Sequence, residues 1–183
     1  MGVVINIGQR PMIIVATPYD YRGNALHQLI NIYMSQSLSK VYVHITFSTK
    51  NRVHLIDNNI KIPLFEYLGG ICKTLECYPV QVGGNLDHVH ILCLLSKKIS
   101  QMKLLEELKK NSSKWLKNQG LKYSTFYWQA GYGIFSVTPA CVNMVSNYII
   151  TQEEHHKKTN FKNEFRTFLM KNKIEYNEPY IWD

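Results

Sequence analysis

The chain has 183 residues, of which 45% are hydrophobic and 12% aromatic, enough to bury a core and to argue against a disordered protein. Its formal net charge of +8 predicts an anionic partner, most commonly nucleic acid, although a basic and merely soluble protein would have the same charge. None of the four cysteines forms a CxxC pair, which argues against a disulfide framework or a zinc site and favours core thiols in a reducing compartment.

The sequence predicts a cytoplasmic protein without a membrane anchor. Its longest apolar runs fall well short of the roughly 20 residues that a membrane helix needs. The N-terminus lacks the basic region and long apolar core of a signal peptide. If the partner is DNA, the protein is expected at the bacterial nucleoid when it is bound.

The first 33 residues differ from the rest of the sequence. They hold two prolines and three glycines around two short apolar patches, without a sustained period. We predict that residues 1–33 are an extension added from an upstream start codon, and that residues 34–183, beginning at Met34, form the functional domain. The alternative is that the extension contributes a small strand or helix.

The next segments alternate between strand and helix patterns. Residues 40–49 are rich in β-branched and aromatic side chains, which favours a strand. Residues 60–77 have apolar side chains at helical spacing. Residues 79–95 predict a strand, a Gly-Gly-Asn turn and a second strand. Residues 99–118 predict an amphipathic helix. Its apolar side consists of Ile99, Met102, Leu105, Leu108 and Trp115.

The C-terminal third continues with one strand and two helices. Residues 126–137 predict an aromatic-rich strand. Thr138 as N-cap and Pro139 at the first helical position predict a helix over 139–156. Its buried side is predicted to consist of Val142, Val145 and Ile149. A shorter amphipathic helix is predicted near 161–172.

The predicted order is β-α-β-β-α-β followed by two helices. This order is typical of an α+β fold of the ferredoxin-like or RRM-like type. Such a fold has one antiparallel sheet with two helices packed on one face, and here it would carry C-terminal helices in addition.

Positive charge is concentrated around the helix predicted over 99–118. Between residues 97 and 122, eight lysines stand against two glutamates, a local charge of 8 − 2 = +6. A uniform solubilising coat would not cluster in this way. We therefore expect this helix to face DNA phosphates, with an affinity that falls steeply as salt rises.

Two histidines, His88 and His90, stand one residue apart in a predicted strand. Residues i and i+2 of a strand point to the same face, so the two imidazoles project together, as binding of a divalent metal ion requires. The alternative is a structural pair of hydrogen-bonded histidines. Two imidazoles are too few for a metal site, so a third ligand would have to come from elsewhere in the chain.

The helix predicted over 139–156 offers further groups. Tyr148 and Gln152 are four residues apart and share a face. Gln152 could give a carbonyl oxygen to a hard metal ion, and Tyr148 could act as a nucleophile if a metal or a base activates its phenol. His155, on a similar face, could be a ligand, a phosphate contact or without a role. The alternative is a tyrosine at the core margin beside a surface glutamine.

Taken together, these pieces resemble the HUH single-tyrosine transposases of the smallest bacterial insertion sequences, the TnpA type, and their REP-associated tyrosine transposase relatives. The resemblance covers about residues 38–183. It is carried by the stretches "HITFSTKNR" (44–52), "GGNLDHVHIL" (83–92), "FYWQAGYGIFSV" (126–137), "VSNYIITQEEHH" (145–156) and "EYNEPYIWD" (175–183).

The resemblance implies a ferredoxin-like DNA transposase that cleaves and rejoins single-stranded DNA by metal-assisted transesterification. It implies that His88 and His90 bind Mg²⁺ or Mn²⁺ and that Gln152 completes the metal site. Tyr148 would attack DNA and form a 5′-phosphotyrosine. The expected partner is single-stranded DNA with hairpin ends, and the expected assembly is a homodimer with the tyrosine helix in trans. No small-molecule cofactor and no membrane are expected.

Further DNA contacts are expected from basic and aromatic side chains. The aromatic residues of 126–137 could stack on bases, although at least two of Phe126, Tyr127, Trp128 and Tyr132 are expected in the core. The candidates for DNA contact are Arg52, Lys109, Lys110, Lys114, Lys117, Trp128, His155, Lys157 and Lys158.

Three rival functions share parts of this pattern. A domesticated relative would bind or nick hairpin DNA without transposition. A non-catalytic nucleic-acid-binding module with RRM-like strand order would leave the histidine pair and the Tyr148–Gln152 pair unused, and no RNP-like aromatic motif is present. A metal hydrolase would need carboxylates near the histidines. Asp87 is the only adjacent one, and strand alternation predicts that it faces away.

Overall fold

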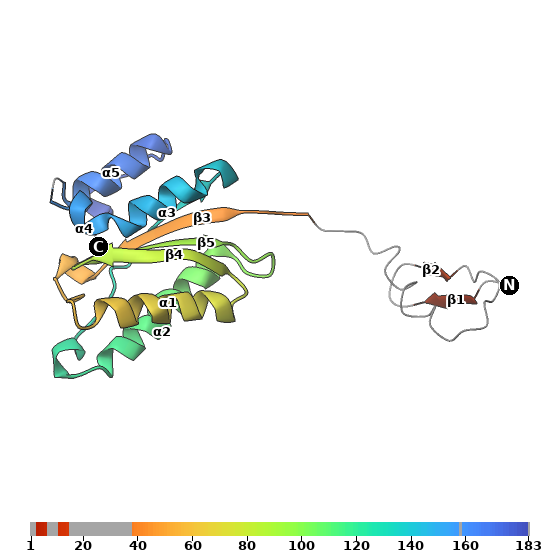
Figure 1. Cartoon of the computed structure of the whole chain (residues 1–183), viewed down its shortest axis with the longest axis horizontal. Helices are drawn as coiled ribbons and strands as arrows, with labels where there is room; N and C mark the ends of the chain where they lie inside the picture. The colour runs from red at the N-terminus through yellow and green to blue at the C-terminus, as the bar shows by residue number, and fades with distance from the viewer. Residues whose placement is uncertain (1–2, 7–10, 15–37, 158, 183) are drawn as a thin grey trace. The chain divides into compact units, whose positions relative to one another are not determined.

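The computed structural model describes residues 3–6, 11–14, 38–157 and 159–182, and the chain divides into two compact units, residues 1–38 and 39–183. In the first unit, β1 (Val3–Asn6) and β2 (Pro11–Ile14) pair antiparallel (Figure 1). Two short strands therefore lie within the segment predicted to be an extension, and its origin from an upstream start codon stays a prediction. The predicted boundary at residues 33 and 34 lies outside the described residues.

The second unit is built on one four-stranded antiparallel sheet with the order β4-β5-β3-β6. This is the strand order of a ferredoxin-like fold, so the predicted α+β fold is confirmed. The strands are β3 (Tyr42–Ser48), β4 (Tyr78–Asn85), β5 (His88–Leu94) and β6 (Gly133–Val137). Within the described part of the chain, no helix is both long enough and apolar enough to span a membrane.

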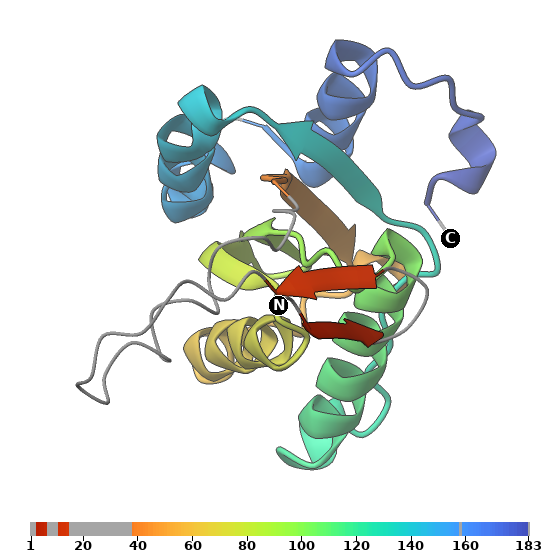
Figure 2. The same cartoon turned by 90° about the vertical axis from the view of Figure 1, so that its right-hand side faces the viewer.

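Helices cover both faces of this sheet (Figure 1, and Figure 2 in a view turned by 90°). One face carries α1 (Lys61–Thr74) and α2 (Gln101–Lys117). The other face carries α3 (Val142–Ile150), α4 (Gln152–His155) and α5 (Phe161–Lys171). Short 3-10 helices are η2 (Lys50–Arg52), η3 (Leu121–Tyr123), η4 (Pro139–Cys141) and η5 (Glu178–Tyr180).

Strand alternation gives the two faces of the sheet different linings. The face toward α1 and α2 belongs to the main hydrophobic core and is lined by Val43, Ile45, Phe47, Val89, Ile91 and Cys93. The face toward α3, α4 and α5 is lined by the intervening residues of the same strands. They include the buried polar side chains of His44, Thr46, Ser48, His88 and His90.

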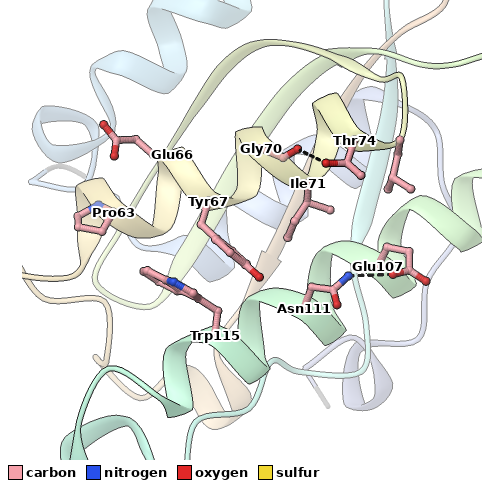
Figure 3. Close-up of a pocket in the computed structure, with 10 residues that line it drawn as sticks. Pro63, Glu66, Tyr67, Gly70, Ile71, Thr74, Glu107, Asn111 and Trp115 are labelled. Atoms are coloured by element: carbon pink, nitrogen blue, oxygen red, sulfur yellow. Dashed lines mark hydrogen bonds between the residues drawn. The ribbon is translucent and has the colours of Figure 1, made fainter.

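The two helices of the apolar face pack on each other as well as on the sheet. Tyr67 of α1 stacks on Trp115 of α2, with ring centroids 4.8 Å apart. Both rings line a groove between the two helices (Figure 3). The expectation that Met102 is buried is wrong, since its side chain is 75% exposed. The buried stripe of α2 is Leu104, Leu105, Leu108, Ser112 and Leu116. At 100° per residue, Met102 lies about 90° from the centre of that stripe.

The Gly-Gly-Asn turn predicted between β4 and β5 is wrong. Gly83 and Gly84 lie inside β4, and the chain turns at residues 86–87. A Cβ atom on Gly83 would stand 2.7 Å from the Cγ2 atom and 2.8 Å from the carbonyl oxygen of Ile149. The glycine is therefore needed because α3 packs directly on the backbone of β4 at this point.

The strand predicted over 126–137 is shorter than expected, since β6 covers only Gly133–Val137. Phe126 and Trp128 turn into the main core, and Trp128 pairs with Thr49 in an isolated bridge. Because Phe126 and Trp128 are buried in the core, the residues before Gly133 do not continue β6 as a regular strand.

The helix predicted over 139–156 is divided at Thr151 into η4 and α3 before it and α4 after it. Pro139 occupies the first position of η4, as predicted. The Thr151 hydroxyl donates to the backbone oxygen of Asn147 at 3.0 Å and lies 3.4 Å from that of Tyr148. A hydroxyl that bonds to the preceding turn in this way competes with the helical hydrogen bonds and bends the helix.

Candidate functional site

The candidate site lies on the polar face of the sheet, beneath α3, α4 and α5. His88 and His90 come from β5, Tyr148 from α3 and Gln152 from the first position of α4. The two histidines and Gln152 are fully or almost fully buried, and Tyr148 is half-buried. The structure therefore brings together residues that are 60 positions apart in the sequence, as the resemblance implied.

His88 is oriented by Asp87. Its Nδ1 atom lies 2.6 Å from the carboxylate oxygen of Asp87, and its Nε2 atom lies 3.3 Å from the side-chain oxygen of Gln152. Burial acts to raise the pKa of Asp87, but the hydrogen bond from His88 and the surrounding histidines hold it below its ordinary value. The ionised carboxylate accepts the Nδ1 hydrogen, so in the neutral ring of His88 the lone pair is on Nε2.

The expectation that Asp87 faces away from the histidines is wrong. Asp87 belongs to the turn before β5 rather than to the strand, so strand alternation does not apply to it. A carboxylate therefore does lie beside the histidines, as a metal hydrolase would also need.

His90 is held by a third imidazole that sequence reasoning did not single out. Its Nδ1 atom lies 2.9 Å from Nε2 of His44 on β3, and the two rings are stacked at 5.0 Å. Burial, together with neighbouring histidines, lowers the pKa of both His44 and His90 well below the ordinary value. Both rings are therefore neutral near pH 7, which is the form that binds metal ions.

Tyr148 contacts the histidine cluster of its own chain. Its ring meets the His90 ring edge-on at 5.9 Å and the His155 ring at 5.1 Å. Phe168 of α5 packs edge-on against Tyr148 at 5.8 Å. The Tyr148 ring therefore lies beside His90, between His155 of α4 and Phe168 of α5.

Glu164 of α5 is a central residue of the site that the sequence analysis missed. Its Oε1 atom accepts a hydrogen bond from Nε2 of Gln152 at 3.1 Å and lies 3.5 Å from Nε2 of His90. Its Oε2 atom lies 3.2 Å from Nε2 of His156 and 3.9 Å from Nε2 of His88. Burial raises the pKa of Glu164 to about 7 and lowers that of His156 to about 4.

A signal for Glu164 was present in the sequence. The buried side of α5 is formed by Phe161, Phe165 and Leu169, and Glu164 lies on the same side of the helix. A charged residue in an apolar stripe is almost never fully buried without a partner, so its position indicates a binding or pairing role. The amphipathic pattern of residues 161–172 was used only to predict the helix.

The residues of this cluster fit a divalent cation. His88, His156 and Glu164 each offer a ligand atom, and these atoms all lie within 4.8 Å of one another. Among the residues that the structure describes, buried polar atoms without a hydrogen-bond partner gather here. They are Nε2 of His90, His155 and His156 and Oε2 of Glu164, together with Oγ1 of Thr46 on the same face.

Two of the residues expected to contact DNA are used by the fold instead. Trp128 is 8% exposed, and its Nε1 hydrogen donates to Ser112 at 2.9 Å, so neither ring face is free for a base. The Lys109 ammonium donates to the backbone oxygens of Gln129, Ala130 and Gly131, at 2.7–3.0 Å. Phe126 and Trp128 are in the core, which agrees with the expectation that at least two of the four aromatics are buried, and Tyr127 and Tyr132 are exposed.

The other basic candidates lie in several places on the second unit. Lys110 and Lys114 are exposed on α2, and Lys117 lies 3.6 Å above the Tyr127 ring. The Arg52 guanidinium lies over the Trp182 ring at 5.7 Å, and Lys157 pairs with Glu154. Lys158 lies outside the described residues. Because α2 covers the face opposite the histidines, its lysines can contact DNA only away from the histidine cluster.

Comparison with known proteins identifies the family. The model of the IS200-like transposase family matches residues 37–152. The chain belongs to the IS200-like transposases. The match includes His88, His90, Tyr148 and Gln152, and it ends before His156 and Glu164. No curated protein matches the chain. Membership of this family favours a metal-dependent enzyme that acts on DNA over the two rivals, a non-catalytic binding module and a metal hydrolase.

Two solved structures share the fold of this transposase. A presumed transposase from Deinococcus radiodurans R1 is 17% identical and has a TM-score of 0.52, over 66% of this chain and 97% of that chain. The REP-associated tyrosine transposase, bound to a REP hairpin, is 15% identical and has a TM-score of 0.50, over 69% of this chain and 74% of that chain. At these identities the likeness concerns the fold alone.

Proposed function

We propose that this transposase cleaves and rejoins single-stranded DNA by metal-assisted transesterification, with Tyr148 as the nucleophile. The observation that supports this most is the meeting of Tyr148 with His90 on the polar face of the sheet, at a ring distance of 5.9 Å. Gln152, one turn after Tyr148, contacts His88 in the same cluster. A nucleophile and a candidate metal site therefore occupy one place.

The ion would be held by His88, His90 and Gln152, and Mg²⁺ or Mn²⁺ is the ion that we propose. The neutral His90 ring offers an unprotonated nitrogen, and Gln152 offers an amide oxygen, which suits a divalent cation. When bound, such an ion neutralises the charge that develops on the non-bridging oxygens of the scissile phosphate.

The covalent step is a transfer of the phosphoryl group to Tyr148. The Tyr148 phenol gives up its proton as its oxygen attacks the phosphorus in line, the bond from phosphorus to the 3′ oxygen breaks, and the released oxygen takes up a proton to become a free 3′-OH, so that no net proton is gained or lost. The 5′ phosphate stays on Tyr148, so no phosphoester bond is lost to water. Since a phenol has a pKa of about 10, the tyrosine is a good leaving group when another 3′-OH attacks and reseals the strand.

The proposed substrate is single-stranded DNA with hairpin ends. The structurally similar REP-associated transposase is bound to a REP hairpin, which supports this substrate class. We assign phosphate contacts away from the cleaved bond to Lys110, Lys114 and Lys117 of α2. Contacts nearer to Tyr148 are assigned to Arg52, His155, Lys157 and Lys158. We also propose a homodimer with the tyrosine helix in trans, in which the partner's helix would take the place that Tyr148 occupies beside His90 of its own chain in the single chain.

The test is a cleavage assay on single-stranded hairpin DNA with Mg²⁺ or Mn²⁺. Wild-type protein should form a covalent protein–DNA adduct, and Tyr148→Phe should abolish it, while the control Tyr127→Phe, at an exposed tyrosine, should retain it. An adduct on Tyr148→Phe would show that another residue is the nucleophile. Undiminished metal-dependent cleavage by His88→Ala would show that the metal site is wrong. Deletion of residues 1–33 should preserve or raise cleavage.

A further inference from the structure

The histidine cluster contains more possible metal ligands than His88, His90 and Gln152 alone. His156 donates its Nδ1 hydrogen to the backbone oxygen of Thr159 at 3.0 Å, because a carbonyl oxygen can only accept. The lone pair of the His156 ring is therefore on Nε2. That atom lies 3.2 Å from Oε2 of Glu164, which is itself an acceptor when ionised.

Two acceptor atoms also face each other at His88. Because its Nδ1 hydrogen is held by Asp87, its Nε2 lone pair faces the Gln152 oxygen at 3.3 Å and Oε2 of Glu164 at 3.9 Å. The amide of Gln152 cannot turn to relieve this, since its nitrogen donates to Oε1 of Glu164 at 3.1 Å. Four acceptor atoms thus face one another, and only a cation or a proton between them removes the repulsion.

The spacing of these atoms fits one ion. Ligand atoms that each lie about 2.1 Å from a common ion are roughly 3 to 4 Å from one another. Three of the separations, 3.2, 3.3 and 3.9 Å, fall in this range, and the ligand atoms of His88, His156 and Glu164 all lie within 4.8 Å of one another. The burial of Glu164, at 5% exposed, requires either a partner of opposite charge or a proton, and no lysine or arginine pairs with it among the described residues.

We propose that Glu164 and His156 are ligands of the catalytic metal ion, alongside the histidine pair and Gln152. This inference rests on the metal-dependent function proposed above, and it adds an anionic ligand that the set drawn from the sequence lacks. The ion then joins β5, α4 and α5, so the C-terminal helix is part of the metal site. Phe161, one turn before Glu164, stacks on the His88 ring at 4.5 Å and fixes the start of α5 over it.

The ligand set also determines which ions bind well. Imidazole nitrogens favour first-row transition ions, whereas Mg²⁺ prefers an all-oxygen environment. A site with three imidazoles and one carboxylate should therefore bind Mn²⁺ more tightly than Mg²⁺.

The rival explanation is a proton on Glu164 that bridges to His156, without a metal role for either residue. Glu164→Gln separates the two explanations, because an amide still donates a hydrogen bond but carries no negative charge. The matched control is Glu154→Gln, which removes an exposed carboxylate of α4 that pairs with Lys157.

The experiment measures Mn²⁺ binding to the full chain, without DNA, from the electron paramagnetic resonance signal of the free ion. Glu164→Gln should weaken Mn²⁺ binding at least about tenfold, while Glu154→Gln should bind as wild type does. Mn²⁺ should also raise the melting temperature of wild type more than that of Glu164→Gln, since it ties α5 to the sheet. If wild type fails to bind Mn²⁺ more tightly than Mg²⁺, the proposed ligand set is wrong.

The other outcomes are distinct. If Glu164→Gln binds Mn²⁺ as wild type does while His88→Ala does not bind, the inference is overturned and the proposed site of His88, His90 and Gln152 stands. If His88→Ala also binds as wild type does, both are wrong. Should Glu164→Gln fail to fold, wild type with Co²⁺ decides by proton NMR. Shifted ring N–H signals from His88, His90 and His156 support the set, and signals from His88 and His90 alone overturn it.

Discussion

The two faces of the sheet are formed by alternate residues of the same strands, yet they bury different kinds of side chain. Toward α1 and α2, Ile45, Phe47 and Val89 pack in an apolar core. Toward α3, α4 and α5, Thr46 and His90 are just as deeply buried but leave polar atoms without hydrogen-bond partners. Burial on the first face stabilises the fold, and burial on the second leaves polar atoms unpaired where we propose that a metal ion binds.

The largest expected difference is between two neighbours on β3. Phe47→Ala should lower the free energy of unfolding by about 3–5 kcal/mol, because the fully buried ring packs against Trp128 and would leave a cavity. Thr46→Val, on the polar face, should raise it by about 1 kcal/mol, because it removes a buried hydroxyl without a partner. Urea denaturation of both variants measures the difference.

Equal losses of stability in these two variants would contradict the comparison. They would mean that the Thr46 hydroxyl is bonded, and that the polar face is packed for stability as the apolar face is.

The next largest effect concerns the contact between β4 and the tyrosine helix. Gly83→Ala places a methyl group against Ile149, so it should push α3 outward, cost about 1–3 kcal/mol and reduce adduct formation by Tyr148. Gly70→Ala is the matched control, in α1, which packs on the apolar face of the sheet. A Cβ atom at Gly70 meets nothing within 4 Å, and alanine in the middle of α1 should stabilise by roughly 0.5–1 kcal/mol. Melting curves together with the cleavage assay test both.

A smaller effect is expected at Asp57, a polar residue that serves the fold. It accepts hydrogen bonds from the Asn59 and Ile60 amides and the Tyr123 hydroxyl, and it pairs with Lys122. The Lys122 hydrogen bond is the main cause that lowers the pKa of Asp57 to about 2. Asp57→Ala should cost about 1 kcal/mol at pH 7.

The sign of the pH dependence at Asp57 follows from the lowered pKa. The folded protein keeps the ionised form, so the Asp57 contribution is present above its ordinary pKa of 3.8 and is lost as the pH falls to about 2. Wild type and Asp57→Ala should therefore converge in stability between pH 4 and pH 2. A constant gap would show that the carboxylate charge is not what stabilises this loop.

The smallest expected effect on stability is at the exposed lysines of α2. Lys114→Met should leave the melting temperature unchanged, and it should reduce the slope of log affinity for DNA against log salt by about 1. Lys109→Met should instead destabilise the fold, because three backbone oxygens lose their donor. If Lys114→Met leaves the salt slope unchanged, α2 does not contact DNA phosphates.

Local patterns in the sequence were enough for the fold and for half of the site. Two-residue alternation correctly put His88 and His90 on the face opposite Val89 and Ile91. The spacing of Tyr148 and Gln152 correctly predicted that both side chains face the same region, although they lie in two helices, α3 and α4, divided at Thr151. These predictions succeeded because each depends on neighbours a few residues apart.

The failures have long-range causes. Gly83 fitted the pattern of a turn glycine. A glycine is required there because Ile149, in a helix much later in the chain, packs against it. Trp128 and Lys109 were expected to contact DNA. Trp128 is instead buried in the core, and Lys109 donates hydrogen bonds to backbone oxygens of a loop. Glu164 could not be placed at the site because no local pattern says which face of the sheet α5 covers.

The central claim is that Tyr148 becomes linked to DNA at the polar face of the sheet. The most direct test is to incubate the full chain with single-stranded hairpin DNA and Mn²⁺, digest the adduct, and map the modified peptide by mass spectrometry. The account predicts a nucleotide 5′-phosphate on Tyr148, absent when the metal is chelated and absent in His88→Ala. A 5′-phosphate on any other residue, or an equal yield without metal, would contradict it.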